Sequence, residues 1–213
     1  MRKRLVLTWI SLMFFSITAE ALELPKWKPR LFLTASGNVW SPGGVDRDRF
    51  LASLGGGVSL LYWFDWNAQV MLTGGYSKLN TERYYWMTDT LAEHSPDVWD
   101  VKADFYAASL ELRRLLPTDR SNFLYIGVGV DYVHFGTVEG KYEIYSTSTP
   151  SKGTINEKRD PSDAFGAHLS PGLFFLFHPR VSVDVTVRMN LFYDGDNSTL
   201  WVEPMFTMGY RLF

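Results

Sequence analysis

Hydrophobic and polar residues alternate with a period of two along most of this chain. The pattern is clearest over residues 181–191, where the odd positions are all apolar and the even positions all polar. A period of two is that of a β-strand, because successive side chains of a strand point to opposite faces of the sheet. Eight segments show it: 30–41, 49–63, 68–79, 101–115, 122–136, 163–177, 180–193 and 199–212. The sequence therefore predicts an all-β protein.

The lengths of these segments, and of the connections between them, indicate the architecture. Most segments reach the roughly 9–11 residues that a strand needs to cross a bilayer at a tilt. Short connections alternate with longer ones: 64–67, 117–121 and 178–179 are short, whereas 42–48, 80–100, 137–162 and 194–198 form the other set. Short turns on one side and long loops on the other are typical of outer-membrane barrels. The pattern predicts an eight-stranded antiparallel up-and-down transmembrane β-barrel with both termini in the periplasm.

The N-terminus has the three-part pattern of a secretory signal peptide. Three basic residues at positions 2–4 precede an apolar stretch over 5–17, and Ala19-Glu20-Ala21 supplies the small residues of a cleavage site. We expect residues 1–21 to be a cleaved signal peptide and residues 22–213 to form the barrel domain. A chain exported in this way, with this strand pattern, belongs in the outer membrane of a Gram-negative bacterium.

Aromatic residues gather toward both ends of the predicted strands. Tyr62, Trp63, Trp66, Phe175 and Phe177 lie beside short turns, and Trp40, Tyr84, Tyr85, Trp86, Trp99 and Trp201 lie near the long loops. Transmembrane barrels carry girdles of aromatic side chains at both membrane interfaces. We expect these residues to form the two girdles.

Four stretches carry a resemblance to a known family: 123–132, 169–173, 178–183 and the C-terminal Gly209-Tyr-Arg-Leu-Phe213. The chain resembles the small eight-stranded outer-membrane β-barrel family, which includes the transmembrane domain of outer membrane protein A and outer membrane protein X. The resemblance implies delivery by periplasmic chaperones and insertion by the barrel-assembly machinery. It also implies an assembly signal formed by Gly209, Tyr210, Leu212 and Phe213. The family usually ends in aromatic-x-Phe, whereas Tyr210 and Phe213 are three apart, so either Phe213 overhangs or the last strand is bulged.

Alternation also predicts which polar residues face the barrel interior. Eight strands enclose a lumen that side chains can fill, so buried charges must pair there. We expect a charge network of Glu111, Arg113, Asp131, His168, Asp184, Arg188, Glu203 and Arg211. Glycines on the same face, at positions 55, 57, 127, 129 and 172, would leave room for bulky neighbours. The network predicts a lumen plugged by polar side chains; a gated polar pore is the alternative.

Candidate catalytic chemistry is confined to His168-Leu169-Ser170, which places an imidazole and a hydroxyl on one side of a strand. Lipid A deacylases of the outer membrane use a His-x-Ser pair followed by Asn, but Pro171 follows here and the pair faces the lumen. We therefore do not expect an enzyme. The chain has no cysteine, and its four histidines show no metal-binding spacing. We expect no metal and no cofactor.

The charge distribution bears on partners. The net charge of −2 argues against binding to nucleic acid. The four outer connections together carry −8, whereas the periplasmic segments are basic, so the outer rim would meet lipopolysaccharide phosphates only through divalent cations or simply remain solvated. We expect contact with outer-membrane lipids and lipopolysaccharide, a monomeric state, and a surface partner at the loop 136–163.

The functional prediction that follows is a structural or surface-interaction protein of the outer membrane. A narrow channel or carrier of a small ligand is the second hypothesis, and conductance in planar bilayers would separate it from the first. A lipid A-modifying hydrolase is a distant third, which release of fatty acid would reveal.

Overall fold

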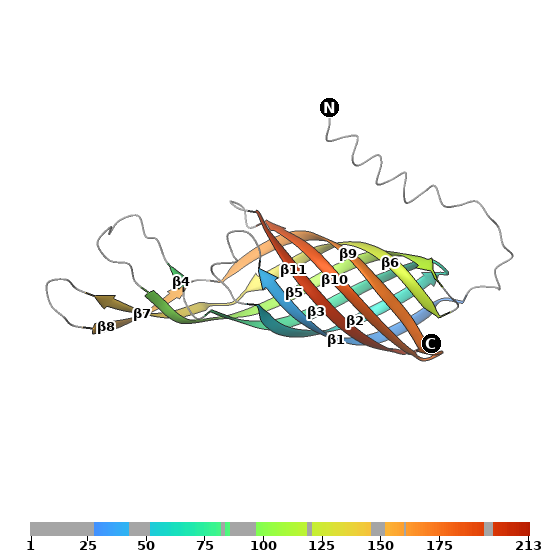
Figure 1. Cartoon of the computed structure of the whole chain (residues 1–213), viewed down its shortest axis with the longest axis horizontal. Helices are drawn as coiled ribbons and strands as arrows, with labels where there is room; N and C mark the ends of the chain where they lie inside the picture. The colour runs from blue at the N-terminus through green and yellow to red at the C-terminus, as the bar shows by residue number, and fades with distance from the viewer. Residues whose placement is uncertain are drawn as a thin grey trace, which may run out of the picture.

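The fold is taken from a computed structural model of the chain, shown in Figure 1. The structure describes residues 28–42, 52–81, 84–85, 97–118, 121–145, 152–159, 161–193 and 198–213. The expected signal peptide, residues 1–21, lies outside the described residues, as does most of the predicted loop 80–100. In the described part of the chain, no helix is long and apolar enough to cross a membrane.

Eight long antiparallel strands form a closed barrel. They are β1 (Arg30–Pro42), β2 (Ser53–Asp65), β3 (Ala68–Thr81), β5 (Asp97–Pro117), β6 (Asn122–Phe135), β9 (Ser162–His178), β10 (Val181–Tyr193) and β11 (Ser198–Arg211). Each pairs with the next along the chain, and β1 pairs with β11 to close the ring. The predicted all-β, up-and-down barrel is confirmed.

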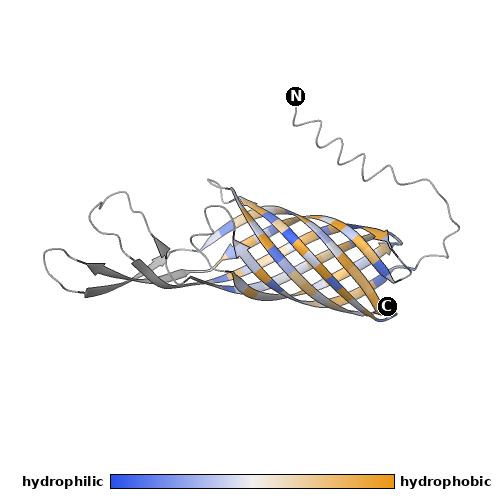
Figure 2. Ribbon diagram, in the orientation of Figure 1, coloured by the Kyte–Doolittle hydropathy of each residue, from blue (hydrophilic) through white to orange (hydrophobic). Residues whose placement is uncertain are grey.

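Alternation of side chains places the apolar residues outside and the polar residues inside. Along β10 the even-numbered side chains from Ser182 to Phe192 are buried, while Val185, Val187, Met189 and Leu191 are exposed on the outer wall. Apolar positions recur in this way around the whole wall (Figure 2). An exposed wall of Leu, Val and aromatic side chains is stable only against lipid, because water would not solvate it.

The two ends of the barrel differ. At one end, here called the turn end, short turns join β2 to β3, β5 to β6 and β9 to β10. Strand β1 begins at this end, and β11 ends there. The opposite end, the loop end, carries the long connections. Figure 1 shows the C-terminus at the turn end.

Three further strands lie beyond the loop end, and together with the start of β5 they form a ribbon. They are β4 (Tyr84–Tyr85), β7 (Val138–Tyr145) and β8 (Lys152–Arg159). β7 pairs with β8 as a hairpin and also with β5, as in Val98 opposite Tyr142. The predicted loop 136–163 thus contains a separate hairpin, which follows a strand break at 136–137 and joins the elongated β5 (Figure 1).

The aromatic girdles agree only in part with the prediction: Tyr62 and Phe177 point outward as expected, but three tryptophans do not. Trp40, Trp63 and Trp201 are at most 5% exposed and lie inside the barrel. On its strand, each of these tryptophans lies an even number of positions from the lumen-facing residues, so it has the same parity, odd or even, and faces the lumen too. Position near a strand end therefore does not identify a girdle residue. The outward aromatics are Tyr76, Tyr106, Tyr132, Phe165 and Tyr193 toward the loop end, and Tyr62, Phe64, Phe177 and Tyr210 toward the turn end. The side chains of Tyr84, Tyr85, Trp86 and Trp99 lie outside the described residues.

The last strand is regular, which decides between the two predictions for Phe213. The register of β11 against β10 runs without a shift from Ser198 to Tyr210. Phe206, Met208, Tyr210 and Leu212 all point outward, and Phe213 is 64% exposed beyond the end of the strand. The Phe213 side chain therefore overhangs the end of β11, while the main-chain oxygen of Phe213 still accepts the Leu31 N–H at 3.2 Å.

Candidate functional site: the barrel lumen

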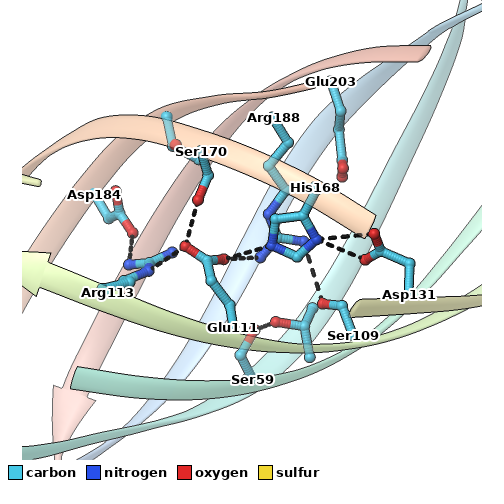
Figure 3. Close-up of polar contacts among 12 residues, drawn as sticks. Ser59, Ser109, Glu111, Arg113, Asp131, His168, Ser170, Asp184, Arg188 and Glu203 are labelled. Carbon is cyan, nitrogen blue, oxygen red and sulfur yellow. Dashed lines mark hydrogen bonds and ion pairs between the residues drawn. The ribbon is translucent and has the colours of Figure 1, made fainter. Parts of the chain in front are cut away.

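The lumen is divided into three layers. Nine buried residues form an apolar cluster near the turn end, the turn-end plug: Phe32, Leu61, Trp63, Met71, Leu115, Phe123, Tyr125, Phe174 and Met205. Six form the loop-end plug: Trp40, Phe105, Val133, Ala164, Phe192 and Trp201. Between the plugs lies the charge network, whose side chains come from β5, β6, β9, β10 and β11 (Figure 3). The sequence predicted the polar middle layer but neither plug.

Arg113 joins two strands on opposite sides of the lumen. Its Nε donates to Glu111 Oε1 at 2.7 Å, and its Nη1 donates to Asp184 on β10 (Figure 3). The guanidinium carbon lies 4.4 Å from the centre of the Tyr125 ring, whose hydroxyl also donates to Asp184, at 2.8 Å. A buried guanidinium held by two carboxylates and a ring face is the arrangement that suits its planar fork.

Glu111 is the centre of the network and is fully buried. Its Oε1 also accepts a hydrogen bond from Ser170 Oγ at 2.6 Å, and its Oε2 accepts one from Arg188 Nη2 at 2.7 Å. Arg188 additionally donates to Ser109 Oγ at 3.3 Å. Glu111 therefore connects both buried arginines, and the loss of this one carboxylate would leave both without an ion-pair partner on β5.

His168 and Ser170 each contact an acidic side chain, but they do not contact one another. His168 Nδ1 lies 2.8 Å from Asp131 Oδ1, and its Nε2 lies 3.4 Å from Glu111 Oε2. The Ser170 hydroxyl donates to Glu111, so it is not aimed at the imidazole. A serine nucleophile needs its base within hydrogen-bond reach and an open approach for substrate. Here both residues are buried between the plugs, and the arrangement is that of a structural network.

Glu203 and Arg211, the other predicted members, are placed differently. Glu203 accepts hydrogen bonds from the side-chain amides of Asn38 and Asn190, the second at 3.4 Å. Arg211 lies outside the network, because it is at the turn end, where its Nη1 donates to the Pro179 carbonyl at 3.3 Å. Its parity is inward, but the plug separates it from the other charges.

Glycines on the lumen face make room for the network, as predicted. A Cβ at Gly127 would lie 2.2 Å from Glu111 Oε1 and 2.3 Å from Ser170 Oγ. At Gly129 it would meet the His168 ring at 2.3 Å, and at Gly172 the Tyr125 ring at 2.4 Å. Real Cβ atoms do not approach so closely. These three positions therefore need glycine so that the large side chains from facing strands can be buried.

Little free volume remains inside the described barrel wall around the network. A cavity of about 20 Å³ lies beneath the loop-end plug, bordered by Asn38, Asp131, Arg188 and Glu203. A space of this size holds about one water molecule. Among the described residues, this cavity is far smaller than the roughly 300–1,000 Å³ of a typical ligand pocket.

A closed barrel with an apolar wall and a packed polar interior is the structure of an integral outer-membrane β-barrel protein. The family comparison agrees. The chain belongs to the outer membrane protein beta-barrel domain family, whose model matches residues 9–203. Membership places the protein in the outer membrane of a Gram-negative bacterium. The comparison with curated proteins gives no match.

Three solved structures align with most of the chain. A major outer membrane protein from Thermus thermophilus aligns with a TM-score of 0.50 at 14% identity, covering 87% of this chain and 100% of that one. Ail, the attachment invasion locus protein of Yersinia pestis, aligns at 0.45 and 16% identity, covering 86% and 97%. Neisserial surface protein A aligns at 0.47 and 11% identity, covering 86% and 99%. Identities this low show the fold alone.

Proposed function

We propose that this outer-membrane protein has a closed lumen and acts through its surface, as a structural and surface-interaction protein. The observation that carries the proposal is the charge network enclosed between two apolar plugs. A conducting path would need a continuous column of water, and the buried ion pairs fill the middle layer. Moving a hydrated ion through the aromatic side chains of both plugs would cost several kcal/mol.

Conductance in planar bilayers tests the closed lumen. We expect the purified, folded protein to give no discrete channel events. A variant that shortens both plugs, Trp63→Ala with Trp201→Ala, is the matched control, because these are the two largest fully buried side chains and lie in different plugs. Regular single-channel steps from the unmodified protein would overturn the proposal and favour a narrow channel.

The second part of the proposal is the orientation, with the turn end in the periplasm and the loop end outside. Short turns on the periplasmic side are the rule in bacterial barrels. The chain has no cysteine, so single cysteines report position without background. We expect a membrane-impermeant maleimide to label Ser198→Cys at the loop end of intact cells but not Thr118→Cys at the turn end. Labelling of Thr118→Cys alone would reverse the orientation.

The ribbon is the element that we assign to surface interaction. It is built from β4, β7, β8 and the start of β5, so its strand pairing is continuous with that of the barrel. Replacing 138–159 by a two-residue Asn-Gly turn should leave the barrel folded, since none of these residues pairs with β6 or β9. Attachment of cells to a protein-coated surface should fall in this variant. Unchanged attachment would remove the interaction role from the ribbon.

We further propose that the protein is not an enzyme. Ser170, the residue that a lipid A hydrolase of this kind would use, is fully buried and donates to Glu111. Lipid A from cells that express Ser170→Ala should match lipid A from cells that express the unmodified protein. A difference in its acyl chains would revive the hydrolase hypothesis.

A further inference from the structure

Three arginines from neighbouring strands meet at the turn end. Arg30 begins β1, Arg211 ends β11, and Arg180 lies in the turn that leads into β10. Around the barrel these strands run in the order β1, β11, β10. Phe32 pairs with Arg211, and the Arg211 N–H donates to the Arg180 carbonyl at 2.8 Å. We call Arg30, Arg180 and Arg211 the basic sector.

The hydrogen-bond partners of Arg180 and Arg211 are neutral. Arg180 Nη1 donates to the Tyr210 hydroxyl at 3.4 Å, and Arg211 Nη1 donates to the Pro179 carbonyl at 3.3 Å. Arg30 lies with its guanidinium carbon 5.3 Å from the centre of the Trp63 ring, and close enough to Arg211 for the two charges to repel one another.

Acidic groups at this end are few. Among the described residues of the turns and strand ends there, Asp65 is the one acidic side chain, and its Oδ1 accepts the Trp66 N–H at 2.8 Å. A carboxylate at Phe213, whose oxygen accepts the Leu31 N–H, would neutralise one of the three positive charges. Among the described residues, Arg180 and Arg211, whose side-chain hydrogen-bond partners are neutral, therefore give this end an excess of positive charge in either case.

The wall directly next to the basic sector is apolar and faces lipid. Leu33, Met208 and Tyr210 are each 50–53% exposed on β1 and β11, and Leu33 pairs with Tyr210. Tyr210 belongs to the girdle at the turn end, so the arginines lie at the height of lipid headgroups. Arg180, which donates to the Tyr210 hydroxyl, lies beside this outer wall, whereas Arg30 and Arg211 have inward parity and lie at the same rim of the barrel. The acyl-chain surface therefore ends where the cations of the rim begin, which is the order of the parts of a phospholipid.

We propose that the basic sector binds the phosphate of an anionic phospholipid whose acyl chains lie along Leu33 and Met208. Guanidiniums bind phosphate oxygens with paired, charge-assisted hydrogen bonds. A zwitterionic headgroup brings its own cation toward the arginines, whereas phosphatidylglycerol does not, so the sector selects net negative lipids. The site is independent of the proposed surface role; the orientation of the barrel decides only which leaflet supplies the lipid.

Lipid titration of the folded protein in a neutral detergent tests the site. Native mass spectrometry gives the apparent Kd for the first phosphatidylglycerol bound, with phosphatidylcholine as the comparison lipid. The test variant is Arg180→Gln with Arg211→Gln. The matched control is Lys78→Gln with Arg114→Gln, which removes the same charge from β3 and β5, away from the sector. Retention of the heat-dependent gel shift shows that each variant is folded.

We expect the Kd for phosphatidylglycerol to rise roughly 20- to 30-fold at low salt in the test variant, about fivefold for each cation removed. The control should stay within about twofold of the unmodified protein, and Arg180→Lys with Arg211→Lys should recover most of the affinity. An equal loss in the control, an unchanged Kd in the test variant, or equal affinity for phosphatidylcholine would each overturn the proposal. Displacement of the lipid by inorganic phosphate at the same concentration would also overturn it, because the apolar wall would then contribute nothing to the affinity.

Discussion

Arg113 shows how a charged residue is accommodated at the centre of a membrane-spanning barrel. It is 1% exposed and pairs with Glu111 and Asp184, which belong to strands on different sides of the lumen. Buried ion pairs add little net stability compared with apolar packing, but removal of one partner leaves an uncompensated charge. The network therefore makes the lumen intolerant of single substitutions.

The first prediction follows from this intolerance. Arg113→Met should lower the free energy of unfolding by about 3–5 kcal/mol, because Asp184 would then be buried without its cation and Glu111 would keep only the ion pair with Arg188. Adding Asp184→Asn should recover part of the loss. Reversible urea unfolding in lipid vesicles, followed by tryptophan fluorescence, gives both values. A loss below about 1 kcal/mol would show that the lumen rearranges or takes up water.

The second prediction compares two glycines. Gly127→Ala should destabilise the barrel by about 1–3 kcal/mol, since its Cβ would overlap Glu111 and Ser170. Gly74→Ala is the matched control, because nothing lies within 4 Å of a Cβ at this outward position. The control should be neutral or mildly stabilising. The same unfolding measurement gives both free energies. Equal effects at both positions would show that Gly127 is not needed to make room for Glu111 and Ser170.

At the scale of the strand, alternation predicts orientation at almost every described position. It assigned Glu111, Arg113, Asp131, His168, Asp184, Arg188 and Glu203 to the lumen, and the structure buries all of them. The same parity applied to Trp40, Trp63 and Trp201 would have predicted the plugs. Position near a strand end places these tryptophans in the girdles instead, because position alone does not show which face of the strand a side chain takes.

The third prediction concerns depth along one strand. Val185 is exposed on the outer wall near the middle of β10, and Tyr193 ends the same face of that strand. Val185→Arg should cost about 2–4 kcal/mol of stability in lipid, while Tyr193→Arg at the interface should cost about 0–1. Unfolding of both variants in the same vesicles gives the comparison. Equal losses of stability for the two variants would mean that Tyr193, at the loop end of β10, lies in the hydrocarbon core of the bilayer and not at its interface.

At the scale of the whole molecule, the number of barrel strands and their up-and-down order followed from the sequence, whereas the pairings across the lumen did not. Arg113 on β5 meets Asp184 on β10 although these strands are not neighbours in the sheet. Such contacts depend on the tilt and stagger of all eight strands together. The pairing of β7 with β5 also joins segments that are distant in the sequence. The alternation of polar and apolar residues in these segments does not indicate which strand pairs with which.

The fourth prediction tests closure of the sheet. Because the barrel has no free edge, detergent at room temperature cannot open it strand by strand. The unboiled protein should migrate differently from the boiled protein on a denaturing gel, and the variant that lacks 138–159 should keep this shift. Migration of correctly inserted, unboiled protein as an unfolded chain would contradict a closed barrel.

The length of β5 has a mechanical consequence. This strand runs without interruption from Asp97 in the ribbon to Pro117 at the turn end, and it pairs with β3 from Val101 to Arg114 and with β6 from Phe105 to Pro117. A pull on the ribbon is therefore transmitted along β5 in shear, and the hydrogen bonds of both ladders share the load and must fail together. Arg113 and Glu111 lie on this same strand, so the ion pairs across the lumen also resist its sliding. Tension applied to the ribbon would therefore be resisted by the hydrogen bonds of the barrel wall and by the ion pairs of the lumen together.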